Sequence, residues 1–168
     1  MRDTAFFDQI HQTSIESDGH QYVLPAFYYA MSMYNVAYLA PLNKIKKFLP
    51  SKQLKPIRVT PFHGVVSFTV FEYQDTDIGP YNEVSIGILA TAGRWEPVGL
   101  GALRALKEPS AYVIQLPVTT EIARHGGVEL YNFPKFIADI DIVREEGWMR
   151  CNLAAEGKHI FTISAQQI

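Results

Sequence analysis

The sequence predicts a single, mainly β domain, and two observations carry this prediction. Runs rich in β-branched and aromatic residues recur between turn-forming residues, which is typical of an antiparallel sheet or barrel. These runs cover residues 28–39, 63–73, 83–92, 111–118, 136–143, 148–153 and 159–164. The chain also has 168 residues, of which 48% are hydrophobic. That length and composition suit one domain, residues 1–168, with a full hydrophobic core.

Two short segments near the C-terminus are typical of hairpin turns. They read Glu145-Glu146-Gly147 and Glu156-Gly157-Lys158, and each separates two of the predicted strands. Glycine adopts the positive φ that tight hairpin turns require. We therefore expect these turns to connect neighbouring antiparallel strands.

Helices are expected to be few and short. Residues 42–49 carry apolar side chains at helical spacing and are followed by Pro50, which ends a helix. The lysines of this segment (Lys44, Lys46 and Lys47) then fall mainly on the exposed side. We expect them to be solvated there rather than to form a basic binding site.

Two further segments are predicted to be helical. Residues 118–125 have Thr119 or Thr120 as a candidate N-cap, and Gly126 with Gly127 as a candidate stop. Residues 2–13 form a plausible amphipathic helix within an N-terminal extension, residues 1–20.

Charge and hydropathy exclude several classes of partner. The net charge is −2 and no basic stripe is present, whereas binding to nucleic acid requires clustered lysine and arginine. No apolar run has the length that a bilayer span needs. The first residues carry acidic and polar side chains and do not resemble a signal peptide. We therefore expect a cytoplasmic protein that binds neither nucleic acid nor membrane.

Neither a disulfide nor a metal site is indicated. The single cysteine, Cys151, has no partner for an internal disulfide. The five histidines are scattered and fit no ligand spacing. We therefore expect neither a metal nor an organic cofactor.

Two segments contain the residues best suited to chemistry. In Gly79-Pro80-Tyr81-Asn82-Glu83, a turn delivers a glutamate to the start of an apolar strand. In the segment 127–135, which reads GVELYNFPK, Lys135 follows Pro134 and precedes Phe136 at the start of another strand. Proline fixes its own φ and biases Phe133 toward an extended conformation. The backbone that bears Lys135 is therefore expected to be stiff and its surroundings apolar.

Both segments resemble signatures of the acetoacetate decarboxylase superfamily. Gly127-x-Glu129 followed by Phe133-Pro134-Lys135 is similar to that family's Schiff-base lysine motif, and Tyr81-x-Glu83 is similar to its second signature. The two segments occur in the family's order. The similarity extends from about residue 25 to the C-terminus, while the family's enzymes are longer.

The resemblance implies a closed, twisted β-barrel of about seven strands with two or three short helices, assembled at least as a dimer. It implies that Lys135 is the nucleophile and that Glu83 positions the substrate or moves a proton. In this chemistry a neutral amine attacks a carbonyl, and the resulting iminium accepts the electrons of the bond that breaks. The expected reaction is a decarboxylation, or aldol or dehydration chemistry, on a small oxo compound. Burial among apolar groups or a neighbouring cation keeps such an amine neutral.

Three positions differ from the family pattern. Phe136 stands where the decarboxylases have a second lysine, Met31 where they have an arginine, and Phe68 where they have a glutamate. Without that arginine the acetoacetate carboxylate lacks an obvious counter-ion, although Arg94 or Arg104 could supply one. A less charged ketone, an aldehyde or a larger keto acid is the better expected substrate. The predicted pocket residues are Met31, Phe68, Tyr81, Glu129, Phe133 and Phe136.

Two alternatives to an enzyme follow from the same residues. In one, the barrel is non-catalytic and binds a mostly apolar small molecule, with Lys135 as a vestige. In the other, the chain is a structural oligomer subunit whose pocket is filled by the three apolar replacements. The retained Lys135 and Glu83 favour the enzyme. Glu129 also has a structural alternative, which is to bind backbone amides or pair with Arg124.

Overall fold

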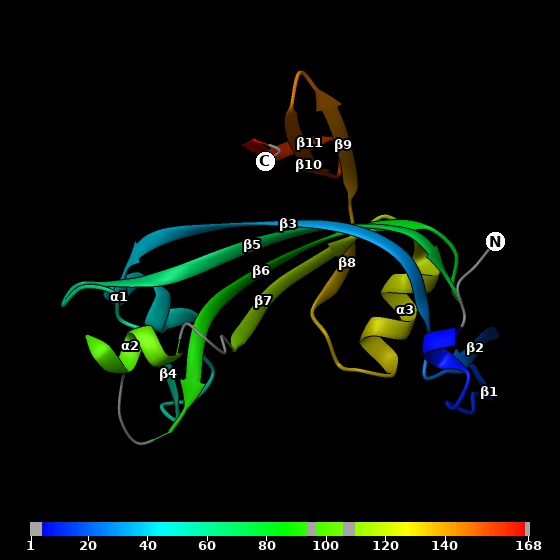
Figure 1. The fold of residues 1–168 in the computed structure, drawn as a ribbon, viewed down its shortest axis with the longest axis horizontal. Helices are drawn as coiled ribbons and strands as arrows, with labels where there is room; N and C mark the ends of the chain where they lie inside the picture. The colour runs from blue at the N-terminus through cyan, green and yellow to red at the C-terminus, as the bar shows by residue number, and fades with distance from the viewer. Residues whose placement is uncertain (1–4, 94–96, 106–109, 167–168) are drawn as a thin grey trace. The chain divides into compact units, whose positions relative to one another are not determined.

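The computed structural model describes residues 5–93, 97–105 and 110–166 and is mainly β (Figure 1). The strands are β1 (Thr13–Ser17), β2 (His20–Leu24), β3 (Tyr28–Pro41), β4 (Leu54–Pro56), β5 (His63–Thr76), β6 (Tyr81–Ala92), β7 (Ala111–Val118), β8 (Lys135–Ile137), β9 (Asp139–Glu145), β10 (Trp148–Ala155) and β11 (Lys158–Gln166). The helices are α1 (Leu42–Ile45), α2 (Leu100–Ala105) and α3 (Glu121–Glu129), and the 3-10 turns are η1 (Ala5–Phe7) and η2 (Lys46–Phe48).

The largest sheet has the strand order β3-β5-β6-β7-β8, with β4 paired to β6. Strands β9, β10 and β11 form a second sheet, and β1 and β2 form a third. Among the described residues no sheet closes into a barrel, so the expected closed barrel is wrong at this point. Closure would require the edge strands β3 and β8 to pair along their length, but β3 has 14 residues and β8 has 3.

Most of the predicted strands are confirmed, with one interruption. The run 136–143 is divided at Ala138 into β8 and β9. β8 pairs with β7 in parallel through Leu116↔Lys135, whereas β9 pairs with β10. The chain thus leaves the large sheet at Ala138 and begins the second sheet there.

Both predicted C-terminal hairpin turns are confirmed. Glu146 and Gly147 connect β9 to β10 with φ of 50° and 79°, and Glu156 and Gly157 connect β10 to β11 with φ of 52° and 71°. Two successive positive φ angles define the hairpin turn whose twist matches that of its strands. The meander of the second sheet therefore follows from its turn residues.

The predicted N-terminal helix is wrong. Only the short turn η1 is helical there, and β1 and β2 form a hairpin across Asp18 and Gly19, whose φ angles are 47° and 80°. Asp-Gly between short strands is a strong hairpin signal, and it outweighs the weak helical spacing before it. Residues 2–4 of the predicted helix lie outside the described residues.

Two compact units make up the chain, and each has its own buried residues. The first comprises Met1–Tyr34, Val70–Val84 and Leu116–Ile168, and the second comprises Asn35–Thr69 and Ser85–Gln115. Buried side chains of the first include Tyr22, Val70, Tyr81, Val84, Val118, Ile140, Cys151 and Leu153. Those of the second include Leu42, Ile45, Ile57, Val65 and Ile88. The expectation of a single domain stays a prediction.

The remaining helices agree with the sequence in position and differ in extent. The segment predicted at 42–49 forms α1 followed by η2, and it ends at Phe48 ahead of Pro50. The segment predicted at 118–125 forms α3, which continues through Gly126 and Gly127 to Glu129. The two glycines are therefore not a helix stop. No helix of the described residues is long and apolar enough to cross a membrane.

Candidate functional site

Lys135 and Glu83 form a buried ion pair in the first unit. Lys135 opens β8, and Glu83 is the third residue of β6. Lys135 Nζ donates a hydrogen bond of 2.7 Å to Glu83 Oε2, and the two side chains are only 9% and 8% exposed. The two strands were expected to be neighbours, but β7 lies between them. The two long side chains meet despite this intervening strand.

The backbone before Lys135 is fixed on both sides. Pro134 O accepts a hydrogen bond from Leu116 N of β7 at 3.1 Å, and Lys135 N donates to Phe133 O at 2.8 Å. Phe133 N in turn donates to Gly127 O of α3 at 2.9 Å. The segment that ends in Lys135 is thus tied to both β7 and the last turn of α3, which agrees with the stiff backbone expected from Pro134.

Gly127 provides the space in which the Lys135 side chain lies. A Cβ added at Gly127 would lie 2.3 Å from Lys135 Cδ and 2.5 Å from its Cε. Any larger residue would therefore displace the lysine. This role of Gly127 is not evident from the sequence, where two glycines after a helical segment favour a helix stop. The available signal was a glycine inside a helical pattern, which often marks a close approach.

The neighbouring glycine helps to fix α3. A Cβ at Gly126 would lie 2.9 Å from the ring of Tyr22. The Tyr22 hydroxyl contacts His125 Nδ1 at 2.7 Å and donates to Ile122 O at 3.3 Å. These contacts hold the helix that presents Gly127 to Lys135.

The electrostatics of Glu83 are dominated by burial. Removal from water raises the pKa of the Glu83 carboxyl, while the attraction and the hydrogen bond of Lys135 oppose this rise. The net direction is upward, so the cost of desolvation exceeds the gain from pairing. Such a carboxyl holds a proton more readily than an exposed glutamate does.

A cluster of three tyrosine rings adjoins the ion pair through Tyr81. Lys135 Nζ lies 5.6 Å from the centre of the Tyr81 ring, which is 5% exposed. The Tyr81 hydroxyl lies 3.2 Å from that of Tyr28, which is 38% exposed. The Tyr73 ring packs between them, at 4.6 Å from Tyr81 and 4.9 Å from Tyr28. Burial is the largest cause that raises the pKa of all three hydroxyls, and the negative charge of Glu83 adds to it.

Three predicted pocket residues stand where the family has polar side chains. Met31 is 42% exposed on β3, and strand alternation places it on the face opposite to Tyr28. Phe136 follows Lys135 in β8, so alternation directs its ring to the other face of that strand. The expectation that these two side chains lie beside the amine stays a prediction. Phe68 belongs to the second unit, where its ring lies 5.7 Å from that of Tyr38.

The remaining candidate residues lie at the surface or outside the described residues. Glu129 is exposed at the end of α3. Its suggested partner Arg124 donates to Glu121 at 2.9 Å, and the negative charge of Glu129 also contributes to the raised pKa of Arg124. Phe133 is 42% exposed. Arg94 lies outside the described residues, and Arg104 is exposed on α2 in the second unit.

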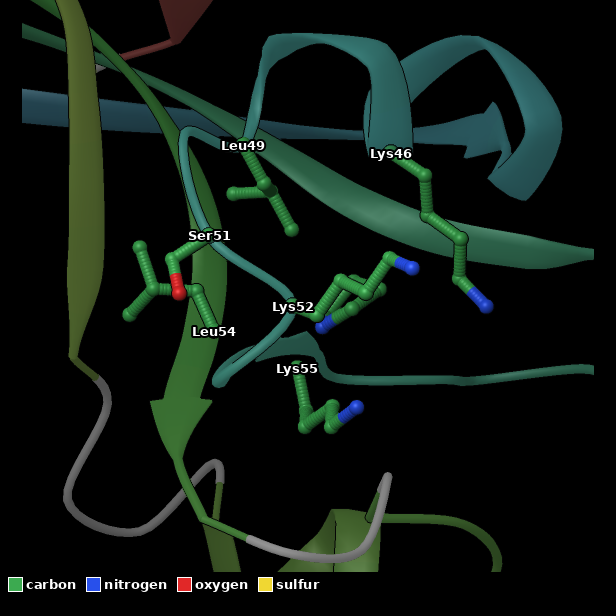
Figure 2. A pocket seen from close by; sticks show the side chains of 7 residues that line it. Lys46, Leu49, Ser51, Lys52, Leu54 and Lys55 are labelled. Carbon is green, nitrogen blue, oxygen red and sulfur yellow. The ribbon is translucent and has the colours of Figure 1, made fainter.

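A pocket of about 220 Å³ lies elsewhere, in the second unit (Figure 2). It is lined by Lys46, Leu49, Ser51, Lys52, Leu54, Lys55 and Pro56. It therefore shares no residue with the group around Lys135. Within the described ranges, no three His, Cys, Asp or Glu side chains gather in a way that could hold a metal ion.

Comparisons with known proteins agree with the two sequence motifs. The family model described as acetoacetate decarboxylase matches residues 14–167. No protein of curated function matches the sequence significantly. A solved acetoacetate decarboxylase superimposes with a TM-score of 0.67 at 18% identity, over 83% of this chain and 50% of that one.

A second solved structure gives the same result. The acetoacetate decarboxylase of Legionella pneumophila subsp. pneumophila str. Philadelphia 1 superimposes with a TM-score of 0.68 at 17% identity, over 84% of this chain and 50% of that one. The chain therefore spans about half the length of the structures it resembles, and it shares their fold over most of its own length. From the extent of the family match, the chain belongs to the acetoacetate decarboxylase family.

Proposed function

We propose that this chain is a Schiff-base lyase that acts on a small oxo compound through Lys135. The observation that carries the proposal is the buried contact of 2.7 Å between Lys135 Nζ and Glu83 Oε2. A carboxylate with a raised pKa beside a buried amine is typical of functional sites. It is also a costly arrangement for a purely structural pair.

Glu83 has the properties of the proton acceptor in this scheme. The Lys135 ammonium has to lose a proton before its nitrogen can attack a carbonyl carbon. Glu83 lies within hydrogen-bonding distance, and its raised pKa suits it to take that proton. Transfer also replaces two buried charges by two neutral groups, which a desolvated site favours.

The subsequent steps use the same two groups. The neutral amine adds to the carbonyl carbon, and the proton held by Glu83 leaves with the carbonyl oxygen as water. An iminium then joins Lys135 Nζ to the former carbonyl carbon. With a keto acid, the bond to the adjacent carboxylate breaks, carbon dioxide leaves and the electron pair moves into the iminium to give an enamine. With a neutral ketone or an aldehyde, loss of an α-proton to Glu83 gives the enamine instead, which leads to aldol or dehydration chemistry. After decarboxylation, Glu83 transfers a proton taken up from water to the carbon, and hydrolysis of the resulting iminium releases the product and restores Lys135.

The surroundings favour a substrate with little charge. Tyr28 and Tyr81 offer hydroxyl groups, which hydrogen bond to an oxygen without supplying a positive charge. We therefore propose a neutral ketone, an aldehyde or a larger keto acid as substrate, rather than acetoacetate itself.

Borohydride trapping tests this proposal. The protein is incubated with acetoacetate, with neutral ketones and with aldehydes, then reduced and mapped by mass spectrometry. We expect an adduct on Lys135, more abundant with the uncharged compounds, and none in Lys135→Met. The exposed Lys158→Met serves as the matched control and should leave trapping unchanged.

Two outcomes would contradict the proposal. The absence of any Lys135 adduct would favour the alternative function, a non-catalytic protein that binds a mostly apolar small molecule. The cluster of Tyr28, Tyr73 and Tyr81 rings is the observation that favours this alternative. Rapid release of carbon dioxide from acetoacetate would instead contradict the proposed substrate class.

Assembly at least as a dimer is part of the same proposal. Light scattering coupled to size-exclusion chromatography tests it, and a monomer at all concentrations would exclude it.

A further inference from the structure

One buried histidine takes no part in the proposed chemistry. His125 lies in α3, is 6% exposed, and comes two residues before Gly127, which makes room for the Lys135 side chain. Both of its ring nitrogens have partners on the hairpin formed by β1 and β2. Nδ1 lies 2.7 Å from the Tyr22 hydroxyl, and Nε2 lies 3.4 Å from Asp18 Oδ2. His125 therefore joins the N-terminal hairpin to the helix beside Lys135.

The polar contacts of this group require three hydrogens. The Tyr22 hydroxyl donates to Ile122 O at 3.3 Å, because a carbonyl oxygen can only accept. Nε2 of His125 has to carry a hydrogen in order to bind the Asp18 carboxylate, for the same reason. With the Tyr22 hydrogen in use, the contact of 2.7 Å requires a hydrogen on Nδ1 as well. A neutral imidazole carries one hydrogen and an imidazolium carries two, so only the charged ring completes all three contacts.

The hairpin, α3 and β8 present the titratable groups around His125. From the hairpin, Asp18 attracts an imidazolium, while the His20 ring, 4.4 Å away, would repel it if both rings were charged. Burial is the main cause that raises the pKa of the Tyr22 hydroxyl, so this group keeps its hydrogen. The charged side chains of α3, and of β8 packed on it, are engaged in ion pairs, namely Glu121 with Arg124 and Lys135 with Glu83.

The contacts of Tyr22 lead on to the Lys135 side chain. The Tyr22 ring lies against Gly126, where an added Cβ would be 2.9 Å from it. The next residue, Gly127, faces Cδ and Cε of Lys135, and its carbonyl oxygen accepts a hydrogen bond from Phe133 N at 2.9 Å. A shift of the last turn of α3 therefore changes both the space for the lysine and the backbone that carries it.

We propose that protonated His125 is a positioning residue for Lys135, acting through Tyr22 and the last turn of α3. The inference rests on the proposed function, because it assigns a regulation by pH to the same site. With the proton in place, the hairpin and α3 are joined by all three contacts. Loss of the proton leaves two hydrogens, so the Tyr22 hydroxyl turns to Nδ1 and its bond to Ile122 O is lost. The last turn of α3 then opens more readily, and histidine makes this change of charge between about pH 5 and 8.

The hydrogens on the His125 ring provide the first test. The two ring nitrogens are followed by NMR of the ¹⁵N-labelled protein from about pH 5 to about pH 8.5, and His125→Gln identifies their signals. We expect hydrogens on both nitrogens at the acidic end and loss of the Nδ1 hydrogen as the pH rises. A ring that is neutral at the acidic end, or that loses the Nε2 hydrogen instead, would overturn the proposal.

Amide hydrogen exchange provides the second test. Leu130 N donates to Gly126 O and Phe133 N donates to Gly127 O, so the protection of these two amides reports opening of the last turn. After correction for the intrinsic effect of pH, this protection should fall about fivefold across the same window, as expected for the loss of one hydrogen bond. The amides of β10 should keep theirs.

Two variants make the exchange result specific. His125→Gln keeps a polar side chain that cannot be charged, so it should remove the fall in protection. His20→Gln takes a histidine from the same hairpin without touching the three contacts, so it should retain the fall. Equal behaviour of the two variants, or constant protection in the parent, would contradict the proposal.

The reactivity of the lysine provides the third test. Limited acetylation, mapped by mass spectrometry, gives the ratio of modified Lys135 to modified Lys158, which is exposed in the same protein. Opening of α3 uncovers the Lys135 amine, so this ratio should rise about fivefold more across the window in the parent than in His125→Gln. Glu83 titrates in both proteins, so their difference isolates His125, and identical ratios would overturn the proposal. None of the three tests uses a carbonyl compound, so absence of a borohydride adduct contradicts the proposed lyase alone.

Discussion

In two ion pairs of the first unit, the surroundings shift the pKa of the glutamate in opposite directions. Lys135 and Glu83 are 9% and 8% exposed, whereas Arg144 and Glu72 are 37% and 25% exposed. Both pairs have a hydrogen-bonded contact, which is 2.7 Å for Lys135 Nζ to Glu83 Oε2 and 3.1 Å for Arg144 Nη1 to Glu72 Oε1. Yet the pKa of Glu83 is raised by burial, and the pKa of Glu72 is lowered, chiefly by the hydrogen bonds from Arg144.

The difference teaches what each pair is suited to do. The Glu72–Arg144 pair favours the ionised carboxylate and links β5 to β9 near the surface. In the Glu83–Lys135 pair the partner compensates only part of the desolvation, so a proton can be exchanged at small cost. Proton exchange is what the proposed chemistry needs, and a structural link does not need it.

Substitution of Lys135→Met should have the largest effect on stability. It leaves Glu83 buried without its partner, and breaking a buried pair in this way costs about 3–5 kcal/mol. The cost should shrink as the pH falls, because a protonated Glu83 no longer needs a cation. Urea unfolding at several pH values measures both quantities.

Two control variants make this result specific. The exposed Lys158→Met should be nearly neutral, and Lys135→Met combined with Glu83→Gln should recover much of the loss, because no charge remains buried. A cost for Lys135→Met that does not change with pH would contradict the role assigned to Glu83.

Gly127→Ala should have the next largest effect. Alanine normally stabilises a helix interior by about 1 kcal/mol over glycine. At Gly127 the added Cβ would displace the Lys135 side chain, and overpacking of this kind costs about 1–3 kcal/mol. Gly101→Ala in α2 is the matched control, because a Cβ there meets nothing within 4 Å.

Unfolding and trapping experiments report on both variants. Gly127→Ala should lose stability and trap less carbonyl compound on Lys135, while Gly101→Ala should trap as the parent does. A Gly127→Ala variant that is more stable and traps normally would show that Lys135 does not need this space.

The sequence was sufficient for the features that depend on local chemistry. The strand runs and the glycine hairpins that connect β9, β10 and β11 follow from short motifs. The meeting of Lys135 with Glu83 was expected from the resemblance of two motifs to one family, because no local feature brings these residues together. The prediction of an N-terminal helix is wrong because the Asp18-Gly19 turn signal for a hairpin is stronger than the apolar spacing that favours a helix. The prediction of a helix stop is wrong because Gly126 and Gly127 lie inside the helix, where they allow Tyr22 and Lys135 to approach closely.

The features that depend on long-range geometry were not predictable in the same way. Neither barrel closure nor the face occupied by Met31 can be determined from one strand at a time, because a shift of one residue exchanges the two faces. Tyr28 was missed for the same reason. Its place beside Tyr81 depends on how β3 is aligned with strands that follow it much later in the sequence.

Glu83→Gln should change the pH dependence of stability in a defined direction. The pKa of Glu83 in the folded protein lies above its unfolded value of about 4.3. Its contribution to stability is therefore complete below about pH 4.3 and is lost as the pH rises through the raised pKa. The parent should lose up to about 1.4 kcal/mol per pH unit in that window, and Glu83→Gln should not. Urea unfolding across the window measures this, and identical slopes would contradict the raised pKa.

Glu72→Gln should have the smallest effect, and its pH dependence should be opposite to that of Glu83. The folded pKa of Glu72 lies below the unfolded value, so its contribution is present above about pH 4.3 and is lost as the pH falls through the lowered pKa. Because the pair is partly exposed and screened by solvent, we expect a cost of about 0–1 kcal/mol at neutral pH, reduced further by salt. The exposed Glu145→Gln is a suitable control on the neighbouring strand end. If Glu72→Gln instead cost as much as Lys135→Met, or altered the pH dependence in the same direction as Glu83→Gln, burial would not be what distinguishes the two pairs.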